Sequence, residues 1–401
     1  MNLDVDRIRS SFPALSQGVA YFDGPGGTQT PREVADAIAA TMTSGISNHG
    51  TVTAAERRAE EVIAAGRSAV SDLLGCRPDG VVFTRSATQA AYDVSRALAK
   101  QWGRGDEVVV SRLDHDANIR PWVQAAEASG ATLRWIEFDR ETAELSVEDV
   151  AAQLSPRTRL VAVTGASNLL GSRPDIPGAA EAVHAVPGAL LYVDGVHLTP
   201  HAPIDVATLG ADFYACSPYK FFGPHHGVVA ADPALLEQLH PDKLLPSSNA
   251  VPERFELGTL PYELLAGTTA AVDFIAGIAT SEGTRRERVL ASMRAVEEHE
   301  DELFARLLDG LSALDGVTLH GSPKRRTPTA LFSVAGQTGQ QVYEHLGGLD
   351  VNAPASSFYA IEASRWMGLG DEGAVRAGLA PYSSTDDVDR LVAGVAALVA
   401  K

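Results

Sequence analysis

Short apolar runs alternate with longer segments of helical periodicity along residues 54–230 of the chain. Helices are expected at 54–74 and at 88–102, the second with caps offered by Ser86 and Thr88. This alternation predicts an α/β fold with a mostly parallel, seven-stranded sheet and crossover helices. The runs with the length and composition of strands are 81–84, 107–110, 132–137, 159–163, 190–193, 212–215 and 227–230.

The pattern changes towards the C-terminus. Two long helical segments, 264–278 and 283–314, lead to a region in which strands and helices alternate in a different rhythm. The second of these segments is expected to be a connecting helix. We therefore expect an N-terminal segment at 1–30, a large domain at 31–282, and the connecting helix with a small α+β domain at 283–401.

Composition narrows the class of protein. With 401 residues and 45% hydrophobic content the chain can bury a large core. Its 51 acidic and 33 basic residues give a net charge of -18, which argues against a nucleic-acid partner. Cys76 and Cys216, the two cysteines, exclude a disulfide framework, and neither has a metal-ligand spacing. No apolar run approaches a membrane span, so we expect a cytoplasmic protein without a metal or a membrane partner.

The first candidate for chemistry is Lys220, which an apolar segment surrounds. Burial disfavours the charged form of an amine and makes it nucleophilic near neutral pH, as a Schiff base requires. Asp194 ends the predicted buried strand at 190–193, where open α/β sheets place their ligands. A strand-end carboxylate followed by such a lysine suits pyridoxal 5'-phosphate (PLP), whose ring nitrogen needs an anion and whose aldehyde needs an amine.

A series of motifs extends this interpretation to nearly the whole chain, which resembles the class V aminotransferases and, among them, the cysteine desulfurase-like and selenocysteine lyase-like proteins. The resemblance implies the PLP-dependent transferase fold (fold-type I) and a homodimer with shared active sites. It also implies that the large domain at 31–282 binds PLP and that the segment at 1–30 joins the small domain and the active site. The motifs that carry it are 21–23, 26–28, 83–89, 114–118, 167–168, 194–195, 217–223, 258–259 and Arg376.

The resemblance also implies roles for individual residues. Lys220 would form the Schiff base and then move protons at the substrate Cα, while Asp194 would keep the pyridine nitrogen protonated. His115 would stack on the cofactor, and Asn168 would bond the ring hydroxyl and contact the substrate carboxylate. His197 replaces the glutamine that is common in cysteine desulfurases, and it could bond the same hydroxyl or shuttle protons.

Phosphate binding is expected at the start of the helix after strand 81–84, where free amides favour an anion. The family usually has glycine at the position of Ala87, so that here only the backbone amide of Ala87 can contribute to phosphate binding. At the position of Tyr219 the family commonly has a histidine. Thr259 would reach the phosphate of the neighbouring subunit. The implied phosphate-binding residues are Ser86, Ala87, Thr88, Ser217, Tyr219 and Thr259.

Arg376 lies on a predicted strand among apolar neighbours. A half-buried arginine is rarely left without an anion, and its planar fork suits a carboxylate. We expect it to bind the α-carboxylate of an amino-acid substrate. The alternative is a structural ion pair with one of the many acidic residues.

The sequence indicates the cofactor more clearly than it indicates the reaction. Cysteine desulfurases use a mobile-loop cysteine, whereas this chain has no cysteine after Cys216 and offers serines at 351–359. The favoured function is therefore a lyase that breaks a C–S or C–Se bond without a catalytic cysteine. The alternatives are an aminotransferase or an amino-acid epimerase, in which His197 or Tyr219 could act opposite Lys220, and a PLP-binding protein without turnover. The substrate pocket is expected among loops 24–28, 47–51 and 353–359.

Overall fold

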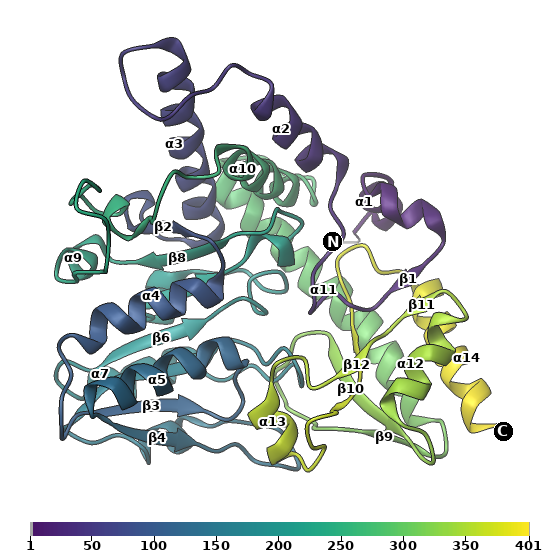
Figure 1. Cartoon of the computed structure of the whole chain (residues 1–401). Coiled ribbons are helices and arrows are strands. Elements are labelled where there is room, and N and C mark those ends of the chain that lie inside the picture. The colour runs from purple at the N-terminus through teal and green to yellow at the C-terminus, as the bar shows by residue number, and fades with distance from the viewer. Residues whose placement is uncertain (1–2, 401) are drawn as a thin grey trace.

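The computed structural model describes residues 3–400, and a seven-stranded sheet forms its centre (Figure 1). Only β8 runs antiparallel to its neighbours β2 and β7, so the predicted, mostly parallel sheet of seven strands is confirmed. The order across the sheet is β2 (Val81–Thr84), β8 (Gly227–Ala231), β7 (Phe213–Cys216), β6 (Leu190–Asp194), β5 (Thr158–Thr164), β3 (Glu107–Ser111) and β4 (Thr132–Ile136).

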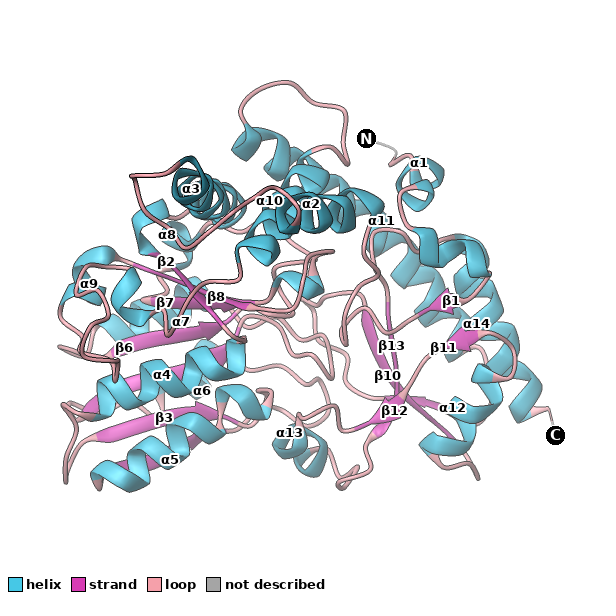
Figure 2. Ribbon diagram, turned by 45° about the horizontal axis from the view of Figure 1, so that its top comes forward, coloured by secondary structure: helices cyan, strands magenta, loops and turns pink. Residues whose placement is uncertain are grey.

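The strands of this sheet are apolar because helices cover both of its faces (Figure 2). Along β5, Val161 and Val163 belong to one buried cluster, and Leu160 and Ala162 belong to the cluster on the opposite face. One face packs on α3 (Ala54–Leu74), α7 (Ile176–His184), α10 (Tyr262–Ala276) and the first half of α11 (Arg285–Ser312). The other face packs on α4 (Ala87–Ala99) and α5 (Arg120–Ser129). Further helices on these layers are α1 (Val5–Ser10), α2 (Arg32–Met42), α6 (Val147–Ala151), α8 (Val206–Leu209), α9 (Pro233–Glu237) and α13 (Ile361–Trp366).

Local signals fix the ends of the helices. Helix α3 begins at a capping box between Thr53 and Glu56, and it ends at Gly75, whose φ of +65° suits glycine. Ser86 caps α4, because its Oγ accepts a hydrogen bond from the amide of Gln89. The expectation that Thr88 also offers a cap is wrong, because Thr88 is the second residue of the helix itself.

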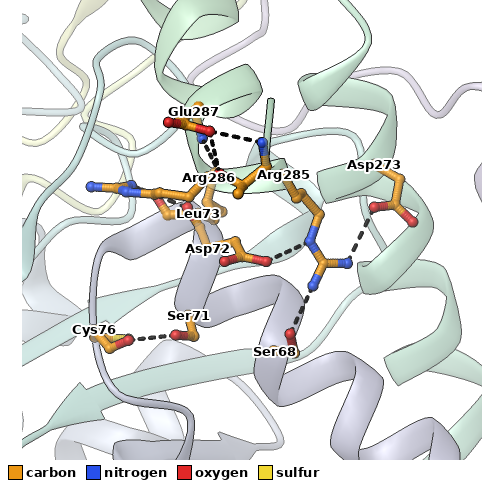
Figure 3. Close-up of polar contacts among 10 residues, drawn as sticks. Ser68, Ser71, Asp72, Leu73, Cys76, Asp273, Arg285, Arg286 and Glu287 are labelled. Carbon is orange, nitrogen blue, oxygen red and sulfur yellow. Dashed lines mark hydrogen bonds and ion pairs between the residues drawn. The ribbon is translucent and has the colours of Figure 1, made fainter. Parts of the chain in front are cut away.

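The predicted connecting helix is α11, and two arginines of its first turn hold it against α3 and α10 (Figure 3). Arg285 forms an ion pair with Asp72 at 2.6 Å and a second with Asp273 at 3.2 Å. Arg286 donates to the carbonyls of Asp72 and Leu73, at 3.1 and 3.0 Å. These carbonyls belong to the last turn of α3, where a helix lacks internal donors.

A second, four-stranded sheet lies in the C-terminal part of the chain. It packs on the second half of α11, on α12 (Gly339–Gly347) and on α14 (Thr385–Val399). Its order is β12 (Ala355–Ser356), β13 (Ala374–Gly378), β10 (Thr329–Val334) and β9 (Val317–Leu319), all antiparallel.

The N-terminal segment also reaches this part of the molecule. Strand β1 (Ala20–Tyr21) pairs with β11 (Val351–Asn352), and Asp23 bridges to Gly378 of β13. The division at 1–30, 31–282 and 283–401 remains a prediction. Among residues 3–400, no helix combines the length and the apolar character needed to cross a membrane.

Candidate active site

A cavity of about 730 Å³ opens at the carboxyl ends of β5, β6 and β7, where ligands bind in open α/β sheets. Three separate parts of the chain line it: the segment after β1, the central sheet and the C-terminal sheet. The predicted site residues that meet here are Lys220, Asp194, His115, His197, Asn168, Ser86, Ala87, Thr88, Ser217, Tyr219 and Arg376.

The amine of Lys220 is buried at the floor of this cavity, in a short 3-10 turn after β7. Its Nζ donates a hydrogen bond to the carbonyl oxygen of Pro25. Burial, together with the positive charge of Arg376, lowers the pKa of Lys220 to about 7. A large fraction of the amine is therefore neutral and nucleophilic at physiological pH.

Asp194 is the last residue of β6, and its side chain faces the same cavity. Its Oδ1 accepts a hydrogen bond from the amide of Val196 at 2.9 Å. Burial raises the pKa of this carboxyl to about 6, an effect that this hydrogen bond and the charge of Lys220 reduce. A buried carboxylate of this kind is stabilised by a cation, and a protonated pyridine nitrogen would serve.

His115 presents a neutral ring to the cavity. Its Nδ1 accepts a hydrogen bond from the amide of Ala117 at 3.0 Å, which leaves the ring proton on Nε2. Burial lowers the pKa of His115 to about 4. The ring of Tyr359 stacks on it, with the two centroids 5.5 Å apart and the planes inclined by 22°. A neutral, held imidazole is suited to stacking on an aromatic cofactor.

Arg376 lies on β13, almost fully buried, as the sequence pattern predicts. Its Nη1 donates to the carbonyl of Asn168 at 2.9 Å, and its Nη2 forms an ion pair with Asp23 at 3.0 Å. The structural ion pair considered as an alternative is therefore present. Burial lowers the pKa of Arg376 to about 10, and its guanidinium lies 3.6 Å from the centroid of the Phe358 ring. Its Nε is buried without a partner in the described chain.

The start of α4 forms the end of the cavity expected to hold a phosphate. Ser86, Ala87 and Thr88 all line it. Gly227 of β8 packs directly behind this turn: a Cβ at Gly227 would lie 2.3 Å from the carbonyl carbon of Ser86 and 2.5 Å from the amide nitrogen of Ala87. A glycine strand residue thus lets the helix start approach the sheet. On the other side, the Tyr219 ring stacks on His225 at 4.7 Å.

Two predicted segments do not reach the cavity of this chain. Thr259 is exposed in the loop before α10, and neither it nor Ser47–Thr51 lines the cavity. The loops at 24–28 and 353–359 do contribute to the lining, through Pro25, Gly26, Pro354, Ser356, Phe358 and Tyr359. The assignment of Thr259 to a neighbouring subunit remains a prediction.

The segment at Phe358 and Tyr359 holds several site residues in place, and sequence reasoning treated it only as a loop. Both residues have left-handed backbones, with φ of 50° and 59°, which is unfavourable without glycine. The carbonyl of Phe358 accepts from Asn168 Nδ2 at 3.0 Å, and the carbonyl of Tyr359 accepts from the amide of Asp116 at 2.7 Å. The sequence contains no glycine or proline at these two positions that would have signalled the turn. Asp23 was part of a motif, but no role was assigned to it.

The cavity fits PLP on its own chemistry. Within the described chain, three buried polar atoms of lining residues lack any partner: Asn168 Oδ1, His197 Nδ1 and Arg376 Nε. Such atoms are costly unless a ligand satisfies them. Together with a nucleophilic lysine, a strand-end carboxylate and a helix N-terminus, they suit a ligand with an aldehyde, a ring nitrogen, a hydroxyl and a phosphate.

Comparison with known proteins decides the family. The sequence profile of the family described as Aminotransferase class-V matches residues 20–391. The chain belongs to the class V aminotransferases. This class V aminotransferase is accordingly a PLP-dependent enzyme, and the expected cofactor and resemblance are confirmed.

Relatives of this class V aminotransferase span its full length. An uncharacterized protein of Mycobacterium tuberculosis is 35% identical, over 99% of this chain and 100% of the relative. The aminotransferase-like protein FGM3 of Gibberella zeae is 31% identical, over 98% and 97%. A probable cysteine desulfurase of Pseudomonas aeruginosa is 32% identical, over 95% of each chain.

Solved structures give the fold. The cysteine desulfurase CsdA of Escherichia coli superposes with a TM-score of 0.86 and 25% identity, over 98% of each chain. A cysteine desulfurase of Thermococcus onnurineus superposes with a TM-score of 0.90 at 24% identity, over 100% of this chain and 99% of that structure. The predicted PLP fold-type I architecture is confirmed.

Proposed function

We propose that this enzyme is a lyase that cleaves the Cβ–S or Cβ–Se bond of an amino acid without a cysteine nucleophile. The cavity itself carries the proposal, because it combines the Lys220 amine with Arg376 and Asn168 but contains neither cysteine of the chain. Cys216 is buried in β7, and burial raises the pKa of its thiol. Cys76 follows α3, and burial raises the pKa of its thiol to about 12. Neither thiol is suited to attack.

The reaction requires proton movement at the substrate Cα. PLP, once transferred from Lys220 to the substrate amine, would withdraw electrons from Cα and leave the Lys220 amine free. The neutral Lys220 amine is the group that would take the Cα proton, and the protonated amine could return it to a carbon of the product. Asp194 would hold the ring nitrogen protonated, and His115 would cover one face and keep water away. The electron pair left at Cα would form a Cα=Cβ bond as the Cβ–S or Cβ–Se bond breaks. Sulfur or selenium would leave with the bonding electrons as sulfide or selenide, and hydrolysis of the remaining fragment would give pyruvate and ammonia.

The substrate carboxylate is assigned to Arg376 and Asn168. The Arg376 Nε–H has no acceptor among the described residues and can donate to a carboxylate oxygen. Asn168 would contribute through its Nδ2 donor, which also bonds the Phe358 carbonyl, because its Oδ1 can only accept. Asp23 and the Asn168 carbonyl hold the guanidinium in place before any substrate binds. Such preorganisation reduces the entropy lost on binding. A small amino acid is the expected partner.

Cofactor binding is assigned to both ends of the cavity. His197 and Asn168 would contact the ring hydroxyl, and the phosphate would lie at the start of α4. We also propose a homodimer in which Thr259 completes the phosphate site of the partner subunit. The full phosphate set is Ser86, Ala87, Thr88, Ser217, Tyr219 and Thr259.

The cellular setting is likewise a proposal. Both cysteines are free, which suits the cytoplasm. The net charge of -18 supports the absence of a nucleic-acid partner.

A second candidate is an aminotransferase or an amino-acid epimerase. The relative named aminotransferase-like protein FGM3 favours it, and so does Tyr219, whose hydroxyl-bearing ring lines the cavity beside Lys220. Transamination would produce a keto acid and the amine form of the cofactor. Epimerisation would return the substrate as the other enantiomer.

The test is product analysis with the visible spectrum of the purified holoenzyme as a guide. L-cysteine, L-cysteine sulfinate, L-selenocysteine and L-alanine are added in turn, with Lys220→Ala as the inactive control. Pyruvate or alanine together with released sulfur, sulfite or selenium supports the lyase. A keto acid with pyridoxamine phosphate would contradict the lyase and support an aminotransferase. Recovery of the substrate as its other enantiomer would contradict the lyase and support an epimerase. A cofactor band that no amino acid alters would point to a PLP-binding protein without turnover.

A further inference from the structure

His197 follows β6 of the central sheet, but its side chain is hydrogen-bonded to Thr329 of the C-terminal sheet. Its Nε2 lies 3.0 Å from the hydroxyl of Thr329, at the start of β10, and 3.0 Å from the hydroxyl of Thr327. All three side chains are buried. The opposite ring nitrogen, Nδ1, belongs to a cavity-lining residue and has no partner in the described chain.

The hydroxyl groups of Thr327 and Thr329 differ in the hydrogen-bond acceptors available to them. Thr327 donates to the carbonyl of Gly171 at 3.3 Å, so its proton has an acceptor other than His197. Among residues 3–400, His197 Nε2 is the one hydrogen-bond acceptor within reach of the Thr329 hydroxyl. A proton on Nε2 would therefore leave the buried Thr329 donor unsatisfied. The hydroxyl protons of both Thr327 and Thr329 have an acceptor only when His197 Nε2 accepts a hydrogen bond from Thr329. In that arrangement the proton of the His197 ring lies on Nδ1.

A second histidine limits rotation of the His197 ring. The His201 ring lies edge-on to it, with centroids 5.1 Å apart and planes inclined by 72°. His201 Nδ1 is bound in turn to the Glu300 carboxylate of α11 at 2.8 Å, and both groups are buried. The ring plane of His197 is thus set by Thr327, Thr329 and His201, none of which lines the cavity.

We propose that Thr329 is a positioning residue that fixes His197 as the tautomer with a proton on Nδ1, so that the ring donates a hydrogen bond to the anionic ring oxygen of PLP. This inference rests on the cofactor assignment of His197 above and adds how the C-terminal sheet controls it. Thr327 supports the ring but does not set the tautomer.

The consequence is measurable in the bound cofactor. A donor to an anionic oxygen favours the less protonated form of the cofactor and so lowers the pH at which its visible spectrum changes. Loss of one hydrogen bond to a charged atom should move that transition upward by about one pH unit. The other charged groups near His197 are His201 on the same loop, Lys220 after β7, Arg376 on β13 and Glu300 behind His201. All of them stay unchanged in the threonine variants.

The experiment titrates the visible absorption of four holoproteins: wild type, Thr329→Val, Thr329→Ser and Thr327→Val. We expect an upward shift in Thr329→Val, a transition close to wild type in Thr329→Ser, and little change in Thr327→Val. Thr318→Val, on the exposed face of neighbouring β9, controls for loss of a threonine from this sheet. An unshifted transition in PLP-loaded Thr329→Val, or an equal shift in Thr327→Val, would overturn the proposal.

A direct measurement covers the case in which Thr329→Val does not fold. In apoprotein labelled with ¹⁵N-histidine, the His197 signals, assigned by their loss in His197→Gln, should show the proton on Nδ1. A proton on Nε2 would refute the tautomer. Neither readout needs turnover, so a failed lyase assay would overturn the proposed reaction and leave this inference standing.

Discussion

At the scale of single residues, the same burial that activates Lys220 should cost the apoprotein stability. The folded-state pKa of about 7 lies below the ordinary 10.5, so the unfolded chain binds more protons between these values and stability rises with pH. We expect Lys220→Met apoprotein to be more stable than wild type, by up to roughly 5 kcal/mol at pH 6, at about 1.4 kcal/mol per pKa unit. The gain should shrink as the pH approaches 10.

Urea denaturation of both apoproteins at pH 6, 8 and 10 measures this difference. Lys324→Met, at a lysine whose side chain is 88% exposed, is the control and should show no such pH trend. An equal stability of wild type and Lys220→Met at pH 6 would show that the amine carries no desolvation cost.

Arg376 should determine substrate binding rather than cofactor binding. Hydrogen bonds to charged groups contribute about 1.5–3 kcal/mol, so Arg376→Ala should raise KM by roughly 10- to 100-fold. Arg376→Lys should recover little of this, because an ammonium cannot present a planar fork. Steady-state kinetics with the visible spectrum recorded in parallel measures both effects. Arg306→Ala, which removes an exposed pair with Asp389, is the control. An unchanged KM in Arg376→Ala would remove the carboxylate assignment.

The residues that sequence reasoning found and those that it missed differ in a physical way. Lys220 and Asp194 were recognisable because each follows an apolar strand, a local pattern. The contact between Asp23 and Arg376 joins positions 353 residues apart, and that between His197 and Thr329 joins positions 132 apart. Such pairs depend on how the N-terminal segment and the second sheet pack against the first, which no local pattern encodes.

At the scale of elements, the strands of the central sheet were predictable because burial on both faces requires continuous apolar runs. The direction of β8 was not predictable, because an apolar run has the same pattern in either direction, and β8 is antiparallel. The left-handed turn at Phe358 and Tyr359 could not be predicted from the sequence for another reason. Its left-handed backbone is stabilised by contacts to Asn168, Asp116 and Arg376 rather than by its own residue types.

Gly227 of strand β8 should be required for tight binding of the PLP phosphate, because it has no side chain that would displace the start of α4. A methyl group at Gly227 would overlap the backbone of Ser86 and Ala87 and push the start of α4 away from the sheet. Gly227→Ala should therefore bind PLP at least ~10-fold more weakly, the equivalent of about 1.4 kcal/mol. Equilibrium titration of apoprotein with PLP, followed by absorption, gives the dissociation constants. Gly103→Ala, where the added methyl group meets nothing within 4 Å, should bind normally. Normal affinity in Gly227→Ala would mean that the phosphate lies elsewhere.

At the scale of the whole molecule, the cavity exists only because distant parts of one chain converge on it. Helix α11 packs on the central core with its first half and on the C-terminal core with its second, so it fixes the distance between the two sheets. The segment after β1 closes the remaining side through Asp23 and Pro25. If the proposed dimer forms, Thr259, which is exposed in this chain, would contribute to the site of a second chain.

Mixing two variants with complementary defects, one inactive and one weakened in PLP binding, tests that shared site. Lys220→Ala lacks the amine, and Thr259→Ala should lack one phosphate contact supplied in trans. In a hybrid dimer, the site with an intact Lys220 receives Thr259 from its Lys220→Ala partner and is whole. Random reassociation after mild unfolding makes about half of the dimers hybrids with one whole site each, so PLP affinity and activity should return at about a quarter of the sites. Mixing either variant with itself is the control. If Thr259 acted within its own chain, no hybrid would contain a whole site and mixing would restore nothing.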